Sequence, residues 1–562
     1  MRKDILSFIL LLVLLLILNW LATGWFFRLD LTSEKRYTLS SNSKEFLKKL
    51  DKDLAVTVYL DGDLNPGFKK LARSTREMLD EFRIHAGDRL IYSFVDPNEG
   101  SMSEKKALYE RLQHLGCEPV PVFESGEDGR KSRSMVFPYA LVAVGDKVST
   151  VNLLDNISGY SGAENLNKSA EGLEYKLMEA FRKMSIAEKP RIAFLEGHGE
   201  LDEIDVVDVT GALSEFYQVE RGQIADNAAI LDPYKVVIVA KPQSLFSEKE
   251  KFVLDQYAMN GGRILWMVDA VTITLDSLTR ATNTVGLMND FNIGDQLFKY
   301  GIRINPNLLE DVQAAQIPIN VSPAGQAPKF VPVPWLFSPL LQPNDVHPVS
   351  RNINLVKGEF VSSIDTVGEG LKLGRHVLLT TSRFTKVNPV PVFVSLAMVN
   401  EQPRQAEFNK QFIPVAYAQE GIFPSVFENR PTPVGLTQVK KRLAESVPTR
   451  MVFVADGDLA KNQVRQRFTN PQIIPLGYDE LSGQTFGNKD FMLNAVNYLA
   501  DDEGWMALRA RNYTLRLLDK EKLGADVWLW KVLNVAVPVA LVVVTGVVFV
   551  WLRRKTYASR KD

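Results

Sequence analysis

The chain of 562 residues has 66 Lys and Arg against 67 Asp and Glu, which gives a formal net charge of -1, and 46 % of its residues are hydrophobic. This balance excludes a chain that is disordered as a whole and a strongly basic nucleic-acid-binding protein. The single Cys excludes an intrachain disulfide and any metal site built from several cysteines.

The first element along the chain is a long apolar segment. Residues 5–27 contain no charged side chain, and about 20 apolar residues suffice to cross a bilayer. A cleavable signal peptide is the alternative interpretation. The segment is longer than the apolar core of a typical signal peptide, however, and no small-residue cleavage site follows it. We therefore expect a retained transmembrane helix over 5–27.

Residues 30–160 are expected to form a first α/β domain. Its predicted strands are 55–60, 90–95, 120–123 and 136–144, its predicted helices are 68–82 and 103–115, and a hairpin is expected at 125–133. This order is typical of a thioredoxin-like layer. The C-x-x-C motif of thioredoxin redox chemistry does not occur, and Cys117 stands alone, so we expect a small buried thiol rather than a redox centre.

An amphipathic helix is predicted over 164–185, where apolar residues recur at intervals of 3.5 to 3.6. We interpret it as a connector that packs between domains. A partner helix in a coiled coil is the alternative, although three heptads are the lower limit for such an assignment.

Residues 190–500 alternate apolar strands with helices. Strands are predicted at 191–195, 236–240, 263–268, 376–382 and 450–455, and helices at 206–216, 247–260, 288–300 and 489–499. Continuous apolar strands indicate a parallel sheet covered on both faces. Pro and Gly are dense at 317–348 and 387–435, which predicts long loops or insertions.

The end of the chain resembles its beginning. A juxtamembrane helix is predicted over 503–523, and a second transmembrane helix over 532–552, which is uncharged and has Trp528, Trp530 and Trp551 near its ends. Each span has basic residues between it and the nearer end of the sequence: Arg2, Lys3, Arg553, Arg554, Lys555, Arg560 and Lys561. The positive-inside rule then predicts that both termini are cytoplasmic and that the region between the spans is periplasmic, in the inner membrane of a bacterial envelope.

Candidate ligand-binding residues follow the predicted parallel strands. Ligands bind beyond the carboxyl ends of the strands in open α/β sheets, where three acidic loops are expected to gather. The residues are Glu196, His198, Glu200, Asp269 and Asp456, the last in an Asp456-Gly457-Asp458 turn. Glu196, His198 and Glu200 have the residue types of a general base or a metal ligand. The alternative is that Gly197 and Gly199 form a tight turn whose polar residues only cap the next helix.

Several common catalytic motifs do not occur in the sequence. It contains no G-x-x-x-x-G-K-[ST] motif, no G-x-S-x-G motif and no H-E-x-x-H motif. We therefore expect no catalytic residues, no metal and no cofactor.

Five segments together resemble one family over essentially the whole chain. They are Arg28–Ser40, Val56–Arg83, Leu195–Leu201 (LEGHGEL), Phe360–Asp365 and Phe486–Leu499. They are similar to the GldG family, gliding-motility ABC-transporter accessory proteins of Bacteroidetes. The resemblance implies a role beside an ABC permease subunit and a cytoplasmic ATPase subunit, in a hetero-oligomer linked to gliding motility or envelope function. The sheet domain also resembles the glutamine-amidotransferase-like fold of intraflagellar-transport proteins, without the Cys–His pair of true amidotransferases.

Three functions remain open from the sequence. The first is a non-catalytic membrane-anchored accessory subunit whose ectodomain binds a ligand or a partner. The second is an envelope hydrolase that uses the loop of Glu196 and His198. The third is a purely structural periplasmic scaffold. Burial of His198 with bonds to its own turn would remove the second.

Overall fold

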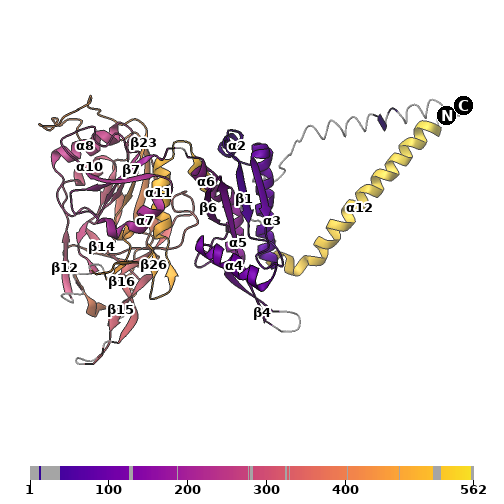
Figure 1. The fold of residues 1–562 in the computed structure, drawn as a ribbon, viewed down its shortest axis with the longest axis horizontal. Helices are drawn as coiled ribbons and strands as arrows, with labels where there is room; N and C mark the ends of the chain where they lie inside the picture. The colour runs from indigo at the N-terminus through magenta and orange to yellow at the C-terminus, as the bar shows by residue number, and fades with distance from the viewer. Residues whose placement is uncertain are drawn as a thin grey trace. The chain divides into compact units, whose positions relative to one another are not determined.

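The computed structural model describes residues 10, 12–13, 38–125, 131–186, 188–275, 278, 283–322, 326–327, 329–400, 403–466, 469–510 and 520–558. The chain forms two compact units, Met1–Arg511 and Asn512–Asp562 (Figure 1). The predicted transmembrane helix over 5–27 lies outside the described residues, apart from Leu10, Leu12 and Val13, which are helical.

A four-stranded sheet in the order β2-β1-β5-β6 forms the first part of the larger unit. β1 is parallel to β2 and antiparallel to β5, and β5 is antiparallel to β6. The elements of this part are α2 (Ser41–Lys48), β1 (Leu54–Val58), α3 (Pro66–Ala86), β2 (Leu90–Phe94), α4 (Met102–His114), β3 (Val120–Ser125), β4 (Lys131–Val136), β5 (Tyr139–Val144) and β6 (Lys147–Asn152). β3 and β4 form a separate hairpin.

The sequence of α3 explains its ends and its orientation. The Asn65 side chain accepts a hydrogen bond from the Phe68 amide, and Pro66 occupies the first turn, where its missing N–H costs nothing. Gly87 ends the helix in the left-handed region, with φ of 64°. One stripe of apolar side chains is buried, and it includes Leu79 and Phe82.

The predicted connector over 164–185 is two helices rather than one. α5 (Gly162–Glu171) begins with a capping box between Ser161 and Glu164, and α6 (Leu173–Ser185) follows after Gly172. α6 packs against β5 and β6. Glycine has a low helix propensity, and the break falls at Gly172. The apolar periodicity continues across this break, so the periodicity alone predicts a single helix.

A sheet of ten strands forms the second part of the larger unit. Nine strands lie in the order β15-β16-β19-β22-β23-β10-β9-β7-β8, and β17 pairs with β16. Their bounds are β7 (Arg191–Glu196), β8 (Gln218–Gln223), β9 (Val236–Ala240), β10 (Arg263–Met267), β15 (Ala314–Asn320), β16 (Phe330–Pro343), β17 (Val356–Lys357), β19 (Leu373–Thr380), β22 (Pro414–Gly421) and β23 (Thr449–Val454).

Half of this sheet is parallel and half is antiparallel. The five strands from β8 to β23 are parallel, and the pairs from β23 to β15 are antiparallel. The prediction of a wholly parallel sheet therefore held only for the first half. In the second half, β16 and β22 lie in the Pro- and Gly-dense stretches, whereas β19 overlaps the strand predicted at 376–382. Together they extend the sheet at its β23 edge.

Helices cover both faces of the parallel half, as the apolar strands predict. On one face, Ile238 and Val452 share a core with α7 (Val207–Leu213) and α11 (Asn488–Ala500). On the other face, Trp266 packs in a second core with two further helices. These are α8 (Glu248–Met259) and α10 (Gly294–Lys299), labelled in Figure 1.

Two sequence expectations are corrected within the insertions. The helix predicted over 288–300 is strand β12 (Asn283–Met288), a turn, and then α10; Asn292 in the turn has φ of 59°, which helix continuation forbids. The Pro-rich stretch 317–348 is largely strand. Among the described residues, 330–334 pair with β15 alone, so one side of this segment has no partner strand. Pro is tolerated there when the position of its missing N–H group faces the unpaired side.

The remaining strands form small pairs and one small sheet: β11 (Val271–Thr272) with β12 and β21 (Val392–Ser395), β13 (Ile302–Ile304) with β18 (Ile364–Thr366), β14 (Asn307–Asp311) with β20 (Thr385–Pro389), β24 (Val464–Arg465) with β25 (Gln472–Ile473), and β26 (Tyr478–Asp479) with β27 (Gln484–Thr485).

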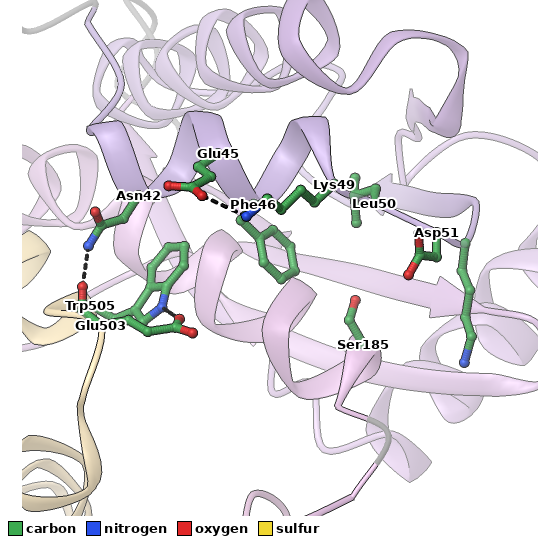
Figure 2. Close-up of a pocket in the computed structure, with 10 residues that line it drawn as sticks. Asn42, Glu45, Phe46, Lys49, Leu50, Asp51, Ser185, Glu503 and Trp505 are labelled. Atoms are coloured by element: carbon green, nitrogen blue, oxygen red, sulfur yellow. Dashed lines mark hydrogen bonds and ion pairs between the residues drawn. The ribbon is translucent and has the colours of Figure 1, made fainter.

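The segments around Asn42 and Glu503, near the two ends of residues 38–510 in the larger unit, meet. The Asn42 Nδ2 group donates to the Glu503 carbonyl oxygen at 2.6 Å, and the Trp505 ring packs edge-on against Phe46 with 5.8 Å between ring centroids. Figure 2 shows both contacts beside a cavity of about 620 Å³. Within the segment predicted as a juxtamembrane helix, Trp505–Ala510 is a 3-10 helix and residues 511–519 lie outside the described residues.

The smaller unit contains one long helix, α12 (Lys520–Ala558), with Pro538 inside it. Its segment Trp528–Lys555 has a mean hydropathy of 2.7, and none of it is buried. Among the described residues, this is the one helix long and apolar enough to cross a membrane. It contains the predicted span 532–552.

Candidate functional site

The sequence-predicted residues fall into two groups at the carboxyl ends of the parallel strands. Glu196, His198 and Glu200 belong to the loop after β7. Asp269 and Asp456 follow β10 and β23, and the Gly457 amide, next to Asp456 in the chain, donates to the Asp269 carboxylate. Among the described residues, no hydrogen bond or ion pair joins the two groups.

The loop after β7 binds its own polar groups. Gly197 and Gly199 have φ of 117° and 74°, which allows the tight turn. The Glu200 carboxylate accepts from the His198 amide at 2.7 Å and lies 3.1 Å from the His198 Nδ1 atom. Glu196 accepts from the Arg221 guanidinium at 2.6 Å. The turn and its cap therefore account for these side chains.

The His198 ring is buried and is fixed by contacts with several side chains. His198 is 2 % exposed, its ring stacks on Phe246 with 3.7 Å between centroids, and its Nε2 atom lies 3.3 Å from the Glu250 carboxylate. Burial lowers the pKa of His198, but the bonds to Glu200 and Glu250 outweigh burial, so the pKa is raised. A buried imidazole between two carboxylates offers no accessible base, and this contradicts the hypothesis of a hydrolase that uses Glu196 and His198.

The second group is a buried cluster around one lysine. The Lys241 ammonium contacts the Asp458 carboxylate and lies 3.2 Å from the Asp269 carboxylate. Asp269 also accepts from the Gly457 amide. Asp456 accepts from the Asp458 amide at 2.8 Å and from the Glu359 amide at 3.0 Å. Three strand ends and one insertion thus contribute to a single cluster.

The backbone at this cluster requires a glycine. Lys241 has φ of 59° and follows β9 directly. A Cβ atom at Gly457 would lie 2.7 Å from the Lys241 Cβ atom, so a side chain at 457 would displace the lysine backbone. The glycine in the Asp456-Gly457-Asp458 turn therefore makes room for the lysine.

Burial dominates the electrostatics of the cluster. It raises the pKa of the Asp269 carboxyl, and burial with the neighbouring Asp269 and Asp458 raises the pKa of Asp456 well above its ordinary value. Burial lowers the pKa of Lys241, but Asp269 and Asp458 outweigh burial, so the pKa is raised above its ordinary value. Burial, followed by Asp458, raises the pKa of Glu359 to about 7.

Asp269, Asp456 and Asp458 are the residues that have the geometry to hold a metal, because one carboxylate oxygen from each lies within 4.8 Å of the others. Oxygen ligands of this kind suit Mg²⁺ or Ca²⁺. The Lys241 ammonium already contacts two of the three, however, and the third accepts two backbone N–H groups. A lysine thus takes the position of the cation in this cluster.

A cavity of about 400 Å³ opens on the cluster. Its lining residues include Asp205, Lys357, Glu359, Asp458, Lys461, Asn462, Tyr478 and Asn488. Sequence reasoning missed Lys241 and Glu359. The position of Lys241 directly after a predicted strand was a usable signal, whereas Glu359 comes from an insertion and nothing in its sequence surroundings indicates the cluster.

A family model described as an ABC-type uncharacterized transport system matches residues 189–495, which is more than half of the chain. The chain belongs to this ABC transport auxiliary family. The match covers the parallel sheet, the cluster around Lys241 and the cavity above it. A second model, a domain of unknown function (DUF7088), matches residues 33–143 of this auxiliary protein.

No curated protein sequence matches the auxiliary protein. A solved structure described as "mmIFT52 N-terminal domain" is similar at 13 % sequence identity, over 56 % of this chain and 98 % of that chain, with a TM-score of 0.30. Membership of the family implies partnership with components of an ABC transport system, and together with the apolar helix α12 it indicates membrane association.

Proposed function

We propose that the protein is a membrane-anchored, non-catalytic accessory subunit of an ABC transporter and assembles with a permease subunit and a cytoplasmic ATPase subunit. The family match over 189–495 carries this proposal. The sequence contains no phosphate-binding P-loop of its own, so the energy source belongs to a partner. The similarity of the five sequence segments to GldG proteins supports a link to gliding motility or envelope function in Bacteroidetes.

The anchor proposed here consists of α12 and the apolar segment 5–27. Arg553, Arg554 and Lys555 follow the apolar part of α12, which supports a cytoplasmic carboxyl terminus in the inner membrane. Arg2 and Lys3 support the same side for the amino terminus, so the region between the two spans is periplasmic in this proposal.

The first part of the ectodomain is proposed to be a thioredoxin-like layer without redox activity. The strand order β2-β1-β5-β6, with one parallel and two antiparallel pairs, supports this assignment. Cys117 is 0 % exposed, and burial raises the pKa of its thiol, which disfavours the reactive thiolate. We assign this part to partner binding, and the second part, with its parallel strands, to an amidotransferase-like or flavodoxin-like sheet that holds the ligand cavity.

Purification of the full-length chain in mild detergent tests the proposal. We expect a permease and an ATPase to co-purify, identified by mass spectrometry. The matched control replaces residues 532–552 by a leucine-rich span of equal length, which keeps the anchor and removes its specific surface. Loss of both partners is expected for this variant. Recovery of the native chain alone, folded and inserted, would contradict the accessory role.

A further inference from the structure

The cavity above the cluster has two unlike surfaces. Its floor carries the carboxyl groups of Glu359 and Asp458, above the buried Asp269, Asp456 and Lys241. Its apolar lining consists of Leu275, Val464, Pro475 and Leu476. With a volume of about 400 Å³, the cavity is as large as roughly a dozen water molecules at about 30 Å³ each. A molecule of several non-hydrogen atoms fits in it, and a single ion would fill little of it.

Two carboxylate groups on this floor, those of the half-buried Glu359 and of the buried Asp458, keep accessible oxygen atoms. The Glu359 carboxylate accepts no hydrogen bond and forms no ion pair with any residue that the structure describes. The Asp458 side chain is more than nine-tenths buried, and one of its oxygens contacts Lys241. Its other oxygen has a single contact in the described part of the chain, with the Lys461 ammonium at 3.9 Å, beyond hydrogen-bond distance. Both groups are open to the cavity.

The charges around the floor do not balance. Four carboxyl groups, those of Asp269, Glu359, Asp456 and Asp458, surround two ammonium groups, those of Lys241 and Lys461. A third lysine of the lining, Lys357, lies 3.4 Å from Asp479 and is neutralised there. The raised pKa of Asp456 favours its neutral form, so the excess over the two ammonium groups comes from Glu359. A proton on Glu359 or a bound cation would neutralise this charge.

We propose that this cavity binds an organic cation, a primary amine or a guanidinium group with a short hydrocarbon part. Its N–H groups donate to the Glu359 carboxylate and to the free oxygen of Asp458, and its hydrocarbon part packs on the apolar lining. An inorganic cation is disfavoured because Lys241 already pairs with two of the three aspartates, Asp269 and Asp458. The inference rests on the proposed ligand-recognising role of the ectodomain and names the class of ligand.

Titration calorimetry of the full-length chain in detergent tests this with three probes: n-butylamine, agmatine and uncharged n-butanol. We expect both cations to bind and n-butanol not to bind. Glu359→Gln should weaken the binding of agmatine at least about tenfold, since a hydrogen bond to a charged group is lost. The matched control is Glu369→Gln, an exposed carboxylate that does not line the cavity. Thermal unfolding of each variant establishes that it is folded.

Three results would overturn the proposal: n-butanol binding as tightly as n-butylamine, no cation binding to the folded chain, or equal affinities of Glu359→Gln and the native chain for agmatine. A fourth arm titrates MgCl₂ and CaCl₂. Micromolar binding of either ion that displaces agmatine would show a metal site instead. Calorimetry does not depend on the permease, so failure here and failure of co-purification are distinguishable.

Discussion

Two loops leave the carboxyl edge of the parallel strands, one after β7 and one after β23, and each carries glycine between acidic residues. In the first, Glu200 and the distant Glu250 use both ring nitrogens of His198. In the second, Asp458 keeps one oxygen that accepts no hydrogen bond from the described residues and faces a cavity. The difference lies in the partners that other segments supply. Glycine between acidic residues after a strand therefore predicts a turn. Whether the turn can bind a ligand depends on the side chains that other segments place beside it.

The largest expected effect is on the second loop. Lys241→Met leaves Asp269, Asp456 and Asp458 buried without their cation, which should lower the free energy of unfolding by about 3–5 kcal/mol. Lys461→Met is the control, because its ammonium is partly exposed and 3.9 Å from Asp458, and it should cost less than about 1 kcal/mol. Denaturant titration of both variants measures this. Equal losses would refute the central role of Lys241.

The corresponding change in the first loop is His198→Leu. It removes the partner between Glu200 and Glu250, and we expect a loss of about 2–3 kcal/mol in the free energy of unfolding. Agmatine affinity, measured by calorimetry, should stay within about twofold. A folded His198→Leu protein that no longer binds agmatine would show that the two loops act as one site.

The stability of the region beside the second loop should depend on pH through Glu359. The pKa of Glu359 is about 7 in the folded chain and lower when unfolded, so the folded state holds the extra proton between these values. Its contribution is complete at low pH and is lost as pH rises through about 7, by about 2 kcal/mol between pH 5 and 7. The charges facing Glu359 are Asp458, Lys241, Lys461 and Lys357.

Unfolding measured from pH 5 to 8 on the native chain and Glu359→Gln checks this. The variant should lose that part of the slope, and agmatine should bind the native chain more tightly at pH 8 than at pH 6. The same slope in both proteins would exclude Glu359 as its source.

The smallest effect is expected for Glu196→Gln. Its ion pair with Arg221 is partly exposed, and such pairs contribute about 0–1 kcal/mol. Thermal unfolding should shift little and agmatine affinity should not change. A loss as large as that of His198→Leu would mean that the first loop depends on this pair.

The sequence predicts well where local pattern decides the structure. β7, β9, β10 and α8 match their predicted positions closely, because apolar strands and the Ser247–Glu250 capping box are local signals. The sequence predicts the structure poorly where the pairing of strands from different segments decides it. The Pro-rich stretch 317–348 was expected to form long loops or insertions, and no local pattern indicates that β16 joins the sheet by pairing with β19.

The same distinction applies to the site. Asp269 and Asp456 were predicted together, because the carboxyl ends of neighbouring parallel strands must meet at one edge. His198 does not join them, because Glu250 in the first turn of α8 and Phe246 just before this helix hold its ring in a separate site. Glu359 lies between β17 and β18, directly before the segment Phe360–Asp365, and no periodicity near it indicates that it reaches the cluster.

The bond between Asn42 and Glu503 has a mechanical consequence. Because residues 42 and 503 lie in contact, a force applied between residues 38 and 510 is carried by α2, by the Phe46–Trp505 contact and by the segment around Glu503. Arg509 also donates to the Pro348 and Arg351 carbonyl oxygens, so part of this force reaches the segment between β16 and β17. Relative movement of residues 38 and 510 would thus shear this short junction, whose residues do not line the cavity beside Lys241.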